Sequence, residues 1–153
     1  MSRFAIVTLL LAAVAGTAAS QVAAADSELP CNKVPGPLVA STLGGRLLDT
    51  RNPGWLDKGE SRCNYRLVFP PDTTSQTFVL WTYPDSEYDG LREVATGFKD
   101  VAGVGDAAHT YVDPDTKRHW LTAVKRGRIT ISATGPAFSR VKQLALLALS
   151  RYN

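Results

Sequence analysis

Apolar and polar positions along the chain predict strands and helices in a regular order. Alternating or β-branched runs are typical of strands, and apolar residues at intervals of three or four are typical of helices. The predicted strands are 46–49, 62–69, 76–83, 107–112, 119–124 and 128–134, and the predicted helices begin near Pro37, at a Ser86-x-x-Asp89 capping box and at Gly135. The order α-β-β-β-α-β-β-β-α predicts an α+β fold, with helices packed on a mainly antiparallel sheet.

The two longest strand patterns, 62–69 and 76–83, are separated by a Pro-Pro-Asp turn signal and should pair as a hairpin. The second pattern is apolar on both faces, with Phe78 on one side and Trp81 on the other. Apolar residues on both faces are typical of a covered, central strand. We therefore expect Trp81, and Trp120 on a later strand, to lie in the core.

Two sets of strand patterns occur in the same order, and each set follows a helix. The first set is GGRLLDTRNP, SRCNYRLV and QTFVLWTYP, and the second is GDAAHTYVDP, KRHWLTAV and RITISATGP. This internal similarity indicates either a duplicated α-β-β-β unit or a coincidence between short apolar strings.

Residues 1–25 have the pattern of a cleaved signal peptide. A positive charge precedes an uncharged apolar run, and small residues follow it. The Ala23-x-Ala25 pair fits signal peptidase, so cleavage is predicted after Ala25, with Ala19 and Ala24 as alternatives.

The remaining residues, 26–153, have a length typical of one domain and contain no linker-like tract. The apolar run in the leader is too short to span a bilayer comfortably, and no second run follows it. Lipid attachment would need a cysteine directly after that run, whereas the first cysteine is Cys31. The sequence therefore predicts an exported, periplasmic or extracellular domain without a transmembrane segment in its mature chain.

Both cysteines, Cys31 and Cys63, follow the predicted cleavage site. In an oxidising compartment an even pair most simply forms one disulfide. Closing that loop lowers the entropy of the unfolded chain and is expected to stabilise the fold by on the order of 3 kcal/mol. The cysteines, His109 and His119 lack the short paired spacings of zinc sites, so no metal site is predicted.

Charge is distributed unevenly along the chain. There are 17 Lys and Arg against 14 Asp and Glu, and Asp115 is the last acidic residue. Beyond it, Lys125, Arg126 and Arg128 gather at one predicted hairpin tip. The simpler interpretation is a solvated tip whose charges discourage edge pairing. The functional alternative is contact with an anionic surface or an acidic envelope partner. Trp55 lies in a polar loop and is predicted to be an exposed contact residue.

Residues 103–108, Gly-Val-Gly-Asp-Ala-Ala, match the G-x-G-x-x-A form of the dinucleotide-binding fingerprint. That site needs a strand before the glycines and a helix after them, because the helix N-terminus binds the pyrophosphate. Here a predicted helix precedes Gly103 and a strand follows Ala108. No cofactor is therefore predicted, and we interpret the segment as a helix-to-strand connection in which Asp106 accepts backbone N–H groups.

No set of catalytic residues is recognisable. The G-x-S-x-G elbow of serine hydrolases is absent from the sequence. Asp113 and Asp115 bracket a proline and are explained by turn chemistry. His109 and His119 fall on adjacent predicted strands and could form an acid–base pair, but half-exposed strand histidines are the simpler interpretation. Nucleic acid is not expected for an exported chain that lacks an aromatic–basic reading motif.

Three short motifs carry a family resemblance. They are the segment PCNKVPGPLVASTLGG, a second cysteine at the start of a strand (Cys63), and the segment VAGVGDAAH before the final hairpin. Together they resemble a class of bacterial exported proteins and lipoproteins of unknown function. The resemblance implies an α+β domain and brings no catalytic residue. The chain lacks the lipid-attachment cysteine of the lipoproteins, which argues against membrane anchoring here.

These observations predict a small exported, non-enzymatic binding protein of the bacterial envelope that acts as a monomer. Two alternatives stay open, a lipid or small-ligand carrier with an internal pocket and a small hydrolase. A carrier needs an apolar cavity on the order of several hundred Å³. A hydrolase needs titratable groups that converge in a cleft.

Overall fold

The computed structural model describes residues 29–54, 56 and 59–152. The predicted signal peptide, residues 1–25, and the predicted contact residue Trp55 lie outside these described residues. No helix in the described ranges has both the length and the apolar character needed to cross a membrane.

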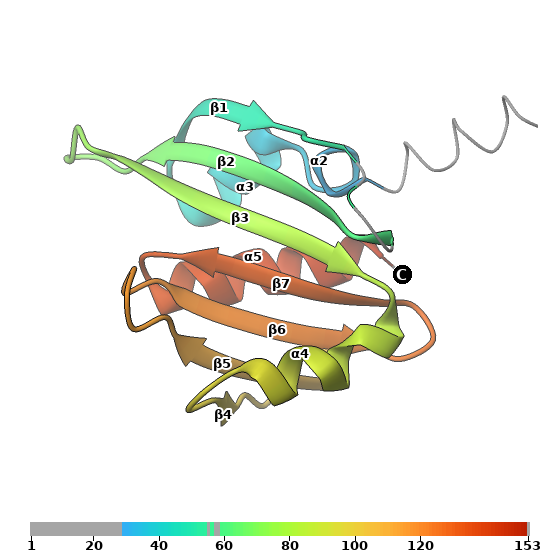
Figure 1. The fold of residues 1–153 in the computed structure, drawn as a ribbon. Coiled ribbons are helices and arrows are strands. Elements are labelled where there is room, and N and C mark those ends of the chain that lie inside the picture. The colour runs from blue at the N-terminus through green and yellow to red at the C-terminus, as the bar shows by residue number, and fades with distance from the viewer. Residues whose placement is uncertain (1–28, 55, 57–58, 153) are drawn as a thin grey trace, which may run out of the picture.

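The fold is α+β and is organised around one antiparallel sheet (Figure 1). The strands are β1 (Arg46–Arg51), β2 (Ser61–Val68), β3 (Ser75–Tyr83), β4 (Lys99–Asp100), β5 (Ala107–Val112), β6 (His119–Lys125) and β7 (Ile129–Gly135). Their order across the sheet is β1-β2-β3-β7-β6-β5-β4. The predicted hairpin of β2 and β3 is confirmed, with Cys63 opposite Leu80. The short edge strand β4 is an element that the sequence pattern did not indicate.

The helices lie on both sides of this sheet. They are α2 (Pro30–Lys33), α3 (Gly36–Leu43), the 3-10 turn η2 (Asp85–Glu87), α4 (Tyr88–Val94) and α5 (Phe138–Arg151). Helices α3 and α5 lie behind the sheet in Figure 1, whereas α4 lies in front of β5 and β6. The structure does not confirm the predicted element order, because α2, η2 and β4 are additional. It does not confirm the repeat either, since α3 and α4 lie on opposite faces.

Two predicted helix starts are wrong. No side-chain capping bond forms at Ser86, and α4 begins at Tyr88 after a 3-10 turn. The turn is held by tertiary contacts, because Gly127 N–H donates to Asp85 Oδ2 at 2.8 Å. Gly135, the other predicted start, is the last residue of β7 and pairs with the first residue of β6, so α5 begins three residues later.

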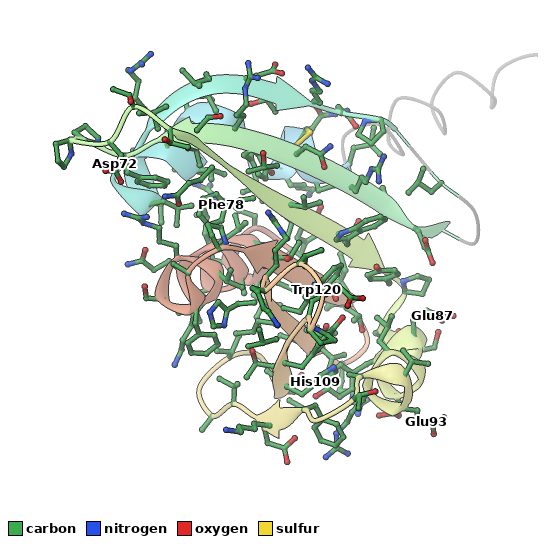
Figure 2. The ribbon with its side chains drawn as sticks, turned by 60° about the vertical axis from the view of Figure 1, so that its left-hand side comes forward. Asp72, Phe78, Glu87, Glu93, His109 and Trp120 are labelled. Atoms are coloured by element: carbon green, nitrogen blue, oxygen red, sulfur yellow. A yellow bond between two sulfur atoms is a disulfide. The ribbon has the colours of Figure 1, made fainter. Side chains whose placement is uncertain are left out.

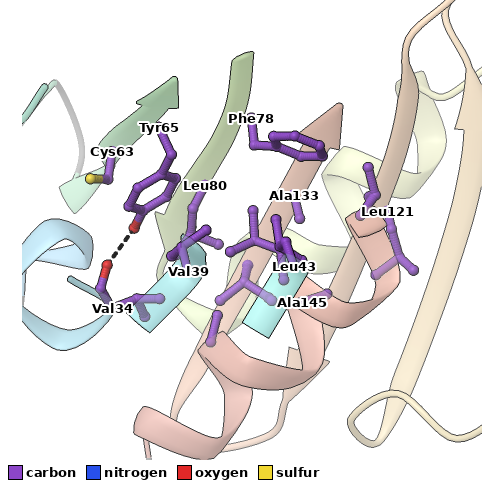
Figure 3. Packing of buried hydrophobic residues seen from close by; sticks show 14 of the residues in the cluster. Val34, Val39, Leu43, Cys63, Tyr65, Phe78, Leu80, Leu121, Ala133 and Ala145 are labelled. Carbon is purple, nitrogen blue, oxygen red and sulfur yellow. Dashed lines mark hydrogen bonds between the residues drawn. The ribbon is translucent and has the colours of Figure 1, made fainter. Parts of the chain in front are cut away.

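The core lies between the sheet and helices α3 and α5 (Figure 3). Its fully buried members from β3, β6, β7 and α5 include Phe78, Leu80, Leu121, Ile131, Ala133, Val141 and Leu144. The predicted Cys31–Cys63 disulfide is confirmed and joins α2 to β2. Beside it, Tyr65 Oη donates a hydrogen bond of 2.7 Å to the carbonyl oxygen of Val34. These two links hold the N-terminal segment against the sheet.

Candidate functional site

The sheet face opposite α3 and α5 carries aromatic and arginine side chains. We call it the aromatic–arginine face and define it by Arg62, Asn64, Arg66, Trp81, Tyr83, Tyr111, Arg118 and Trp120. In Figure 2, Trp120 lies on the same side of the sheet as α4 and away from α5. The prediction that Trp81 and Trp120 lie in the core is therefore wrong. Both are half-buried, because the short helix α4 covers only part of this face.

The aromatic rings of this face form two stacked pairs. The ring centroids of Trp81 and Tyr83 are 6.3 Å apart, with planes inclined by 13°. Those of Tyr111 and Trp120 are 5.9 Å apart and inclined by 9°. The guanidinium carbon of Arg62 lies 5.2 Å from the centroid of the Trp81 ring, a cation–π geometry. Stacking fixes the rotamers of these side chains and makes the platform rigid.

The tyrosines of the platform stay protonated at neutral pH. Burial raises the pKa of Tyr83, and the charges of Glu60 and Tyr111 raise it further. Burial also raises the pKa of Tyr111, with a smaller contribution from Asp113. Both hydroxyl groups can therefore donate a hydrogen bond to a ligand.

Arg118 joins two parts of the sheet on this face. Its Nη2 donates to the carbonyl oxygen of Thr77 on β3 at 2.6 Å, and its Nε donates to Thr134 Oγ1 on β7 at 3.4 Å. Strand β3 pairs with β7 only from Val79 onward, so this guanidinium bridges the strands just beyond their last paired residues. Arg118 thereby places a positive charge at the end of the face, next to the level of Trp120 and Val79.

Several polar atoms of this face have no hydrogen-bond partner among the described residues. They are the donors Trp81 Nε1, Trp120 Nε1 and Arg62 Nε and the acceptor Asn64 Oδ1. A buried polar group that lacks a partner costs about 1–3 kcal/mol.

A hollow of about 240 Å³ lies on the same face beside the aromatic platform. Its lining is polar and consists of Asp49, Arg51, Asn64, Arg66 and Thr77. Arg51 Nε donates to Asp49 Oδ2 at 2.8 Å, whereas Arg66 is exposed and has no ion-pair partner among the described residues. The hollow therefore has an uncompensated positive charge suited to one anionic group.

The hairpin tip predicted as a binding site, Lys125, Arg126 and Arg128, is partly engaged in the fold. The guanidinium of Arg126 lies 5.5 Å from the Tyr88 ring centroid, and its Nη2 is 3.6 Å from Asp89 Oδ1. Lys125 is the half-buried last residue of β6, and Arg128 is exposed. Arg128 and Tyr83 line one hollow of about 330 Å³, so the tip borders the aromatic–arginine face at that end of the sheet. Binding at the tip itself stays a separate prediction.

The alternative that His109 and His119 form a pair does not hold, and the preferred interpretation of half-exposed strand histidines fits His119 but is wrong for His109. His109 lies opposite Thr122, and His119 lies opposite Val112, so the two rings are on opposite faces of the sheet. His109 is fully buried below α4, between the rings of Tyr88 and Phe98 at centroid distances of 5.3 and 5.8 Å. Neither of its ring nitrogens has a partner among the described residues.

We expect the burial of His109 to make the fold sensitive to acid. Burial lowers its pKa below the ordinary value of 6.5, Arg92 lowers it further, and Asp100 partly opposes the shift. Below about pH 6.5 the unfolded chain then binds more protons than the folded one, so the free energy of unfolding falls as the pH drops. Urea denaturation of wild type and His109→Phe between pH 7 and 5 measures this, and the variant should show a flatter pH dependence. An unchanged slope would place the acid sensitivity elsewhere.

Within the described part of the chain, no three His, Cys, Asp or Glu side chains gather closely enough to hold a metal ion. A further hollow of about 490 Å³, partly lined by Tyr111, Val112, His119 and Phe138, has the size of a small-ligand pocket. Thr110 also lines it, and its hydroxyl donates a hydrogen bond of 2.6 Å to the carbonyl oxygen of Trp120.

No protein-family profile and no curated protein matches the sequence. Among solved structures, the chain is similar to a GTP binding regulator from Thermotoga maritima, with a TM-score of 0.46 and 10% identity. The alignment covers 76% of this chain and 89% of that protein.

Proposed function

We propose that this chain is an exported, non-enzymatic binding protein of the bacterial envelope that holds an anionic ligand on its aromatic–arginine face. The observation that carries the proposal is the charge of that face. Arg51, Arg62, Arg66 and Arg118 lie on it, and Asp49 is the acidic residue among the described outward positions of β1 to β3. Arginine suits this role because its planar guanidinium binds carboxylates and phosphates with two parallel hydrogen bonds.

The residue types of this face also support binding. Trp, Tyr and Arg are the side chains that contribute most to the energy of protein interfaces. Two tryptophans, two tyrosines and several arginines lie together here on neighbouring strands. A sheet held by α3 and α5 from behind gives these side chains a rigid support, which lowers the entropy lost on binding.

The compartment is supported by two features of the chain. The first 25 residues have the pattern of a signal peptide. The Cys31–Cys63 disulfide is typical of proteins that fold in an oxidising compartment. The resemblance to bacterial exported proteins of unknown function agrees with both features.

Charge reversal tests which surface binds anions. We expect wild type to bind phosphatidylglycerol vesicles, polyphosphate or poly-L-glutamate in a salt-sensitive way, and Arg62→Glu/Arg66→Glu to lower that affinity about tenfold or more. Lys142→Glu on α5 is the matched control and should bind like wild type. Affinity is measured by vesicle co-sedimentation and by titration calorimetry.

The hairpin tip is the competing anion-binding site. If Lys125→Glu/Arg128→Glu abolishes binding and the face variant does not, the site is the tip and the proposal is wrong. Absence of wild-type binding to every anionic probe at low salt would also overturn it.

A further inference from the structure

We infer that the ligand of the aromatic–arginine face is an acidic polysaccharide, a polymer of sugar rings that bear carboxylates. This inference rests on the proposed function and names the chemical class of the ligand at the same site. Three features of the face support it: the spacing of its arginines, the mixture of hydrogen-bond donors and acceptors that line its hollow, and the geometry of its aromatic pairs.

The arginines are spaced for a polymer. Arg62 and Arg66 point to the same side of β2 and are four residues apart, which places their Cα atoms roughly 13 Å from each other. Arg51 lies opposite Asn64 on the neighbouring strand, between these two positions. The guanidinium of Arg62 lies over the Trp81 ring and that of Arg51 is paired with Asp49, so these charges are held at separate places on the face. A chain with repeated carboxylates can contact each of them where it lies.

The hydrogen-bonding groups in the hollow include both donors and acceptors. Arg66 lines it as a donor, and the carboxylate of Asp49 lines it as an acceptor. Sugar hydroxyl groups can donate to Asp49, and carboxylates accept from arginine. Polyphosphate at neutral pH offers mainly acceptors, so it has no donor for the Asp49 carboxylate.

The aromatic pairs suit sugar rings. Trp81 and Trp120 are separated by β7 and offset by two residues, so their Cα atoms are about 12 Å apart. The residues between them, Ser132 and Thr134, are small. Polarised C–H groups on the faces of sugar rings are attracted to the negative face of an aromatic ring. A span of this length is longer than one sugar ring and therefore favours an oligosaccharide.

The shape of the face agrees with an extended ligand. The hollow of about 240 Å³ beside Arg66 is smaller than the roughly 300–1,000 Å³ of pockets that enclose a small ligand. It has room for one carboxylate-bearing group, while the rest of the polymer lies across the platform. Backbone-rich acidic peptides lack the flat C–H faces that the two tryptophans would contact.

The test compares polyanions of equal charge with one another and with a neutral sugar polymer, all at the same ionic strength. Polygalacturonate is the acidic sugar polymer, poly-L-glutamate and polyphosphate are anions without sugar rings, dextran is the neutral sugar polymer, and oligo-dT represents nucleic acid. By titration calorimetry with the full mature protein, we expect polygalacturonate to bind about tenfold tighter than any other probe.

Variants connect this preference to the face. Trp81→Ala/Trp120→Ala should weaken polygalacturonate binding about tenfold and leave poly-L-glutamate binding close to wild type. Trp120→Phe keeps an aromatic ring at this position, so it should show a smaller loss. Circular dichroism checks folding, and Asn64→Leu replaces the double variant if that protein is unfolded.

Each remaining outcome contradicts the inference in a different way. Equal binding of poly-L-glutamate and polygalacturonate would overturn the sugar specificity and leave the proposed anion-binding function intact. Tighter binding of oligo-dT would identify nucleic acid instead. No binding of any polyanion would overturn the inference and the proposed function together.

Discussion

The double variant Cys31→Ala/Cys63→Ala is expected to lose about 3–4 kcal/mol of its free energy of unfolding. The disulfide closes a loop with a sequence separation of 32 residues, and breaking it enlarges the conformational freedom of the unfolded chain. It also joins α2 to β2, so its removal weakens the support of the Tyr65–Val34 hydrogen bond. Urea denaturation at pH 7, followed by tryptophan fluorescence, measures the difference.

Reduced wild type is the matched control for this variant, because it removes the covalent bond without changing the buried side chains. Its stability in excess reductant should be close to that of the double variant. A loss below about 1 kcal/mol in both proteins would show that the described core holds the N-terminal segment without the disulfide.

The substitution Gly105→Ala is expected to lower the free energy of unfolding by about 2–4 kcal/mol. Gly105 has φ of +61°, and a Cβ there would lie 2.5 Å from the carbonyl oxygen of Val124. The same oxygen accepts a hydrogen bond of 2.9 Å from Asp106 N–H, so it cannot move away freely. The added methyl group therefore strains the backbone and disturbs the contact with β6.

Gly103 provides a control in the same loop. It also has positive φ, at +74°, but no atom lies within 4 Å of the position of its Cβ. Gly103→Ala should therefore cost only about 1 kcal/mol, the conformational penalty alone. Thermal and urea denaturation of both variants separate the two costs. Equal losses in the two variants would mean that the close approach to Val124 is not important.

The strands were predictable because their side-chain alternation is local. The period of two is visible in the sequence of β2, β3 and β7, and each predicted strand is present within about one or two residues, the usual uncertainty of boundaries. The disulfide was predictable from the compartment. Asp106 was correctly expected to accept a backbone N–H, although the donor, Arg126 at 2.8 Å, lies on the hairpin tip outside its own loop.

The side of the sheet that helices cover is not a local property. Alternation shows that Trp81 and Tyr83 share a face, but it does not say whether α3 and α5 lie on that face. The error about Trp81 follows from this limit. The alternation of Arg62, Asn64 and Arg66 with buried neighbours on β2 was the available signal for the aromatic–arginine face.

The relation between His109 and His119 depended on register. Both residues are on paired strands, and the intervening turn decides which residues lie opposite each other. The turn puts Val112 opposite His119. Val112 is three residues from His109 on β5, so His119 lies on the other side of the sheet from His109. The sequence of the turn alone did not specify this pairing.

The pairing of β3 with β7 makes the sheet a union of two meanders along one seam. The seam consists of Val79 to Tyr83 paired with Thr130 to Thr134. At its end, Arg118 donates a hydrogen bond to the carbonyl oxygen of Thr77 on β3. A polymer that contacts Trp81 and Trp120 at once crosses this seam and binds both meanders of the sheet. Ligand binding is thus linked to the stability of the pairing between β3 and β7, because a ligand that binds only the paired strands stabilises that pairing.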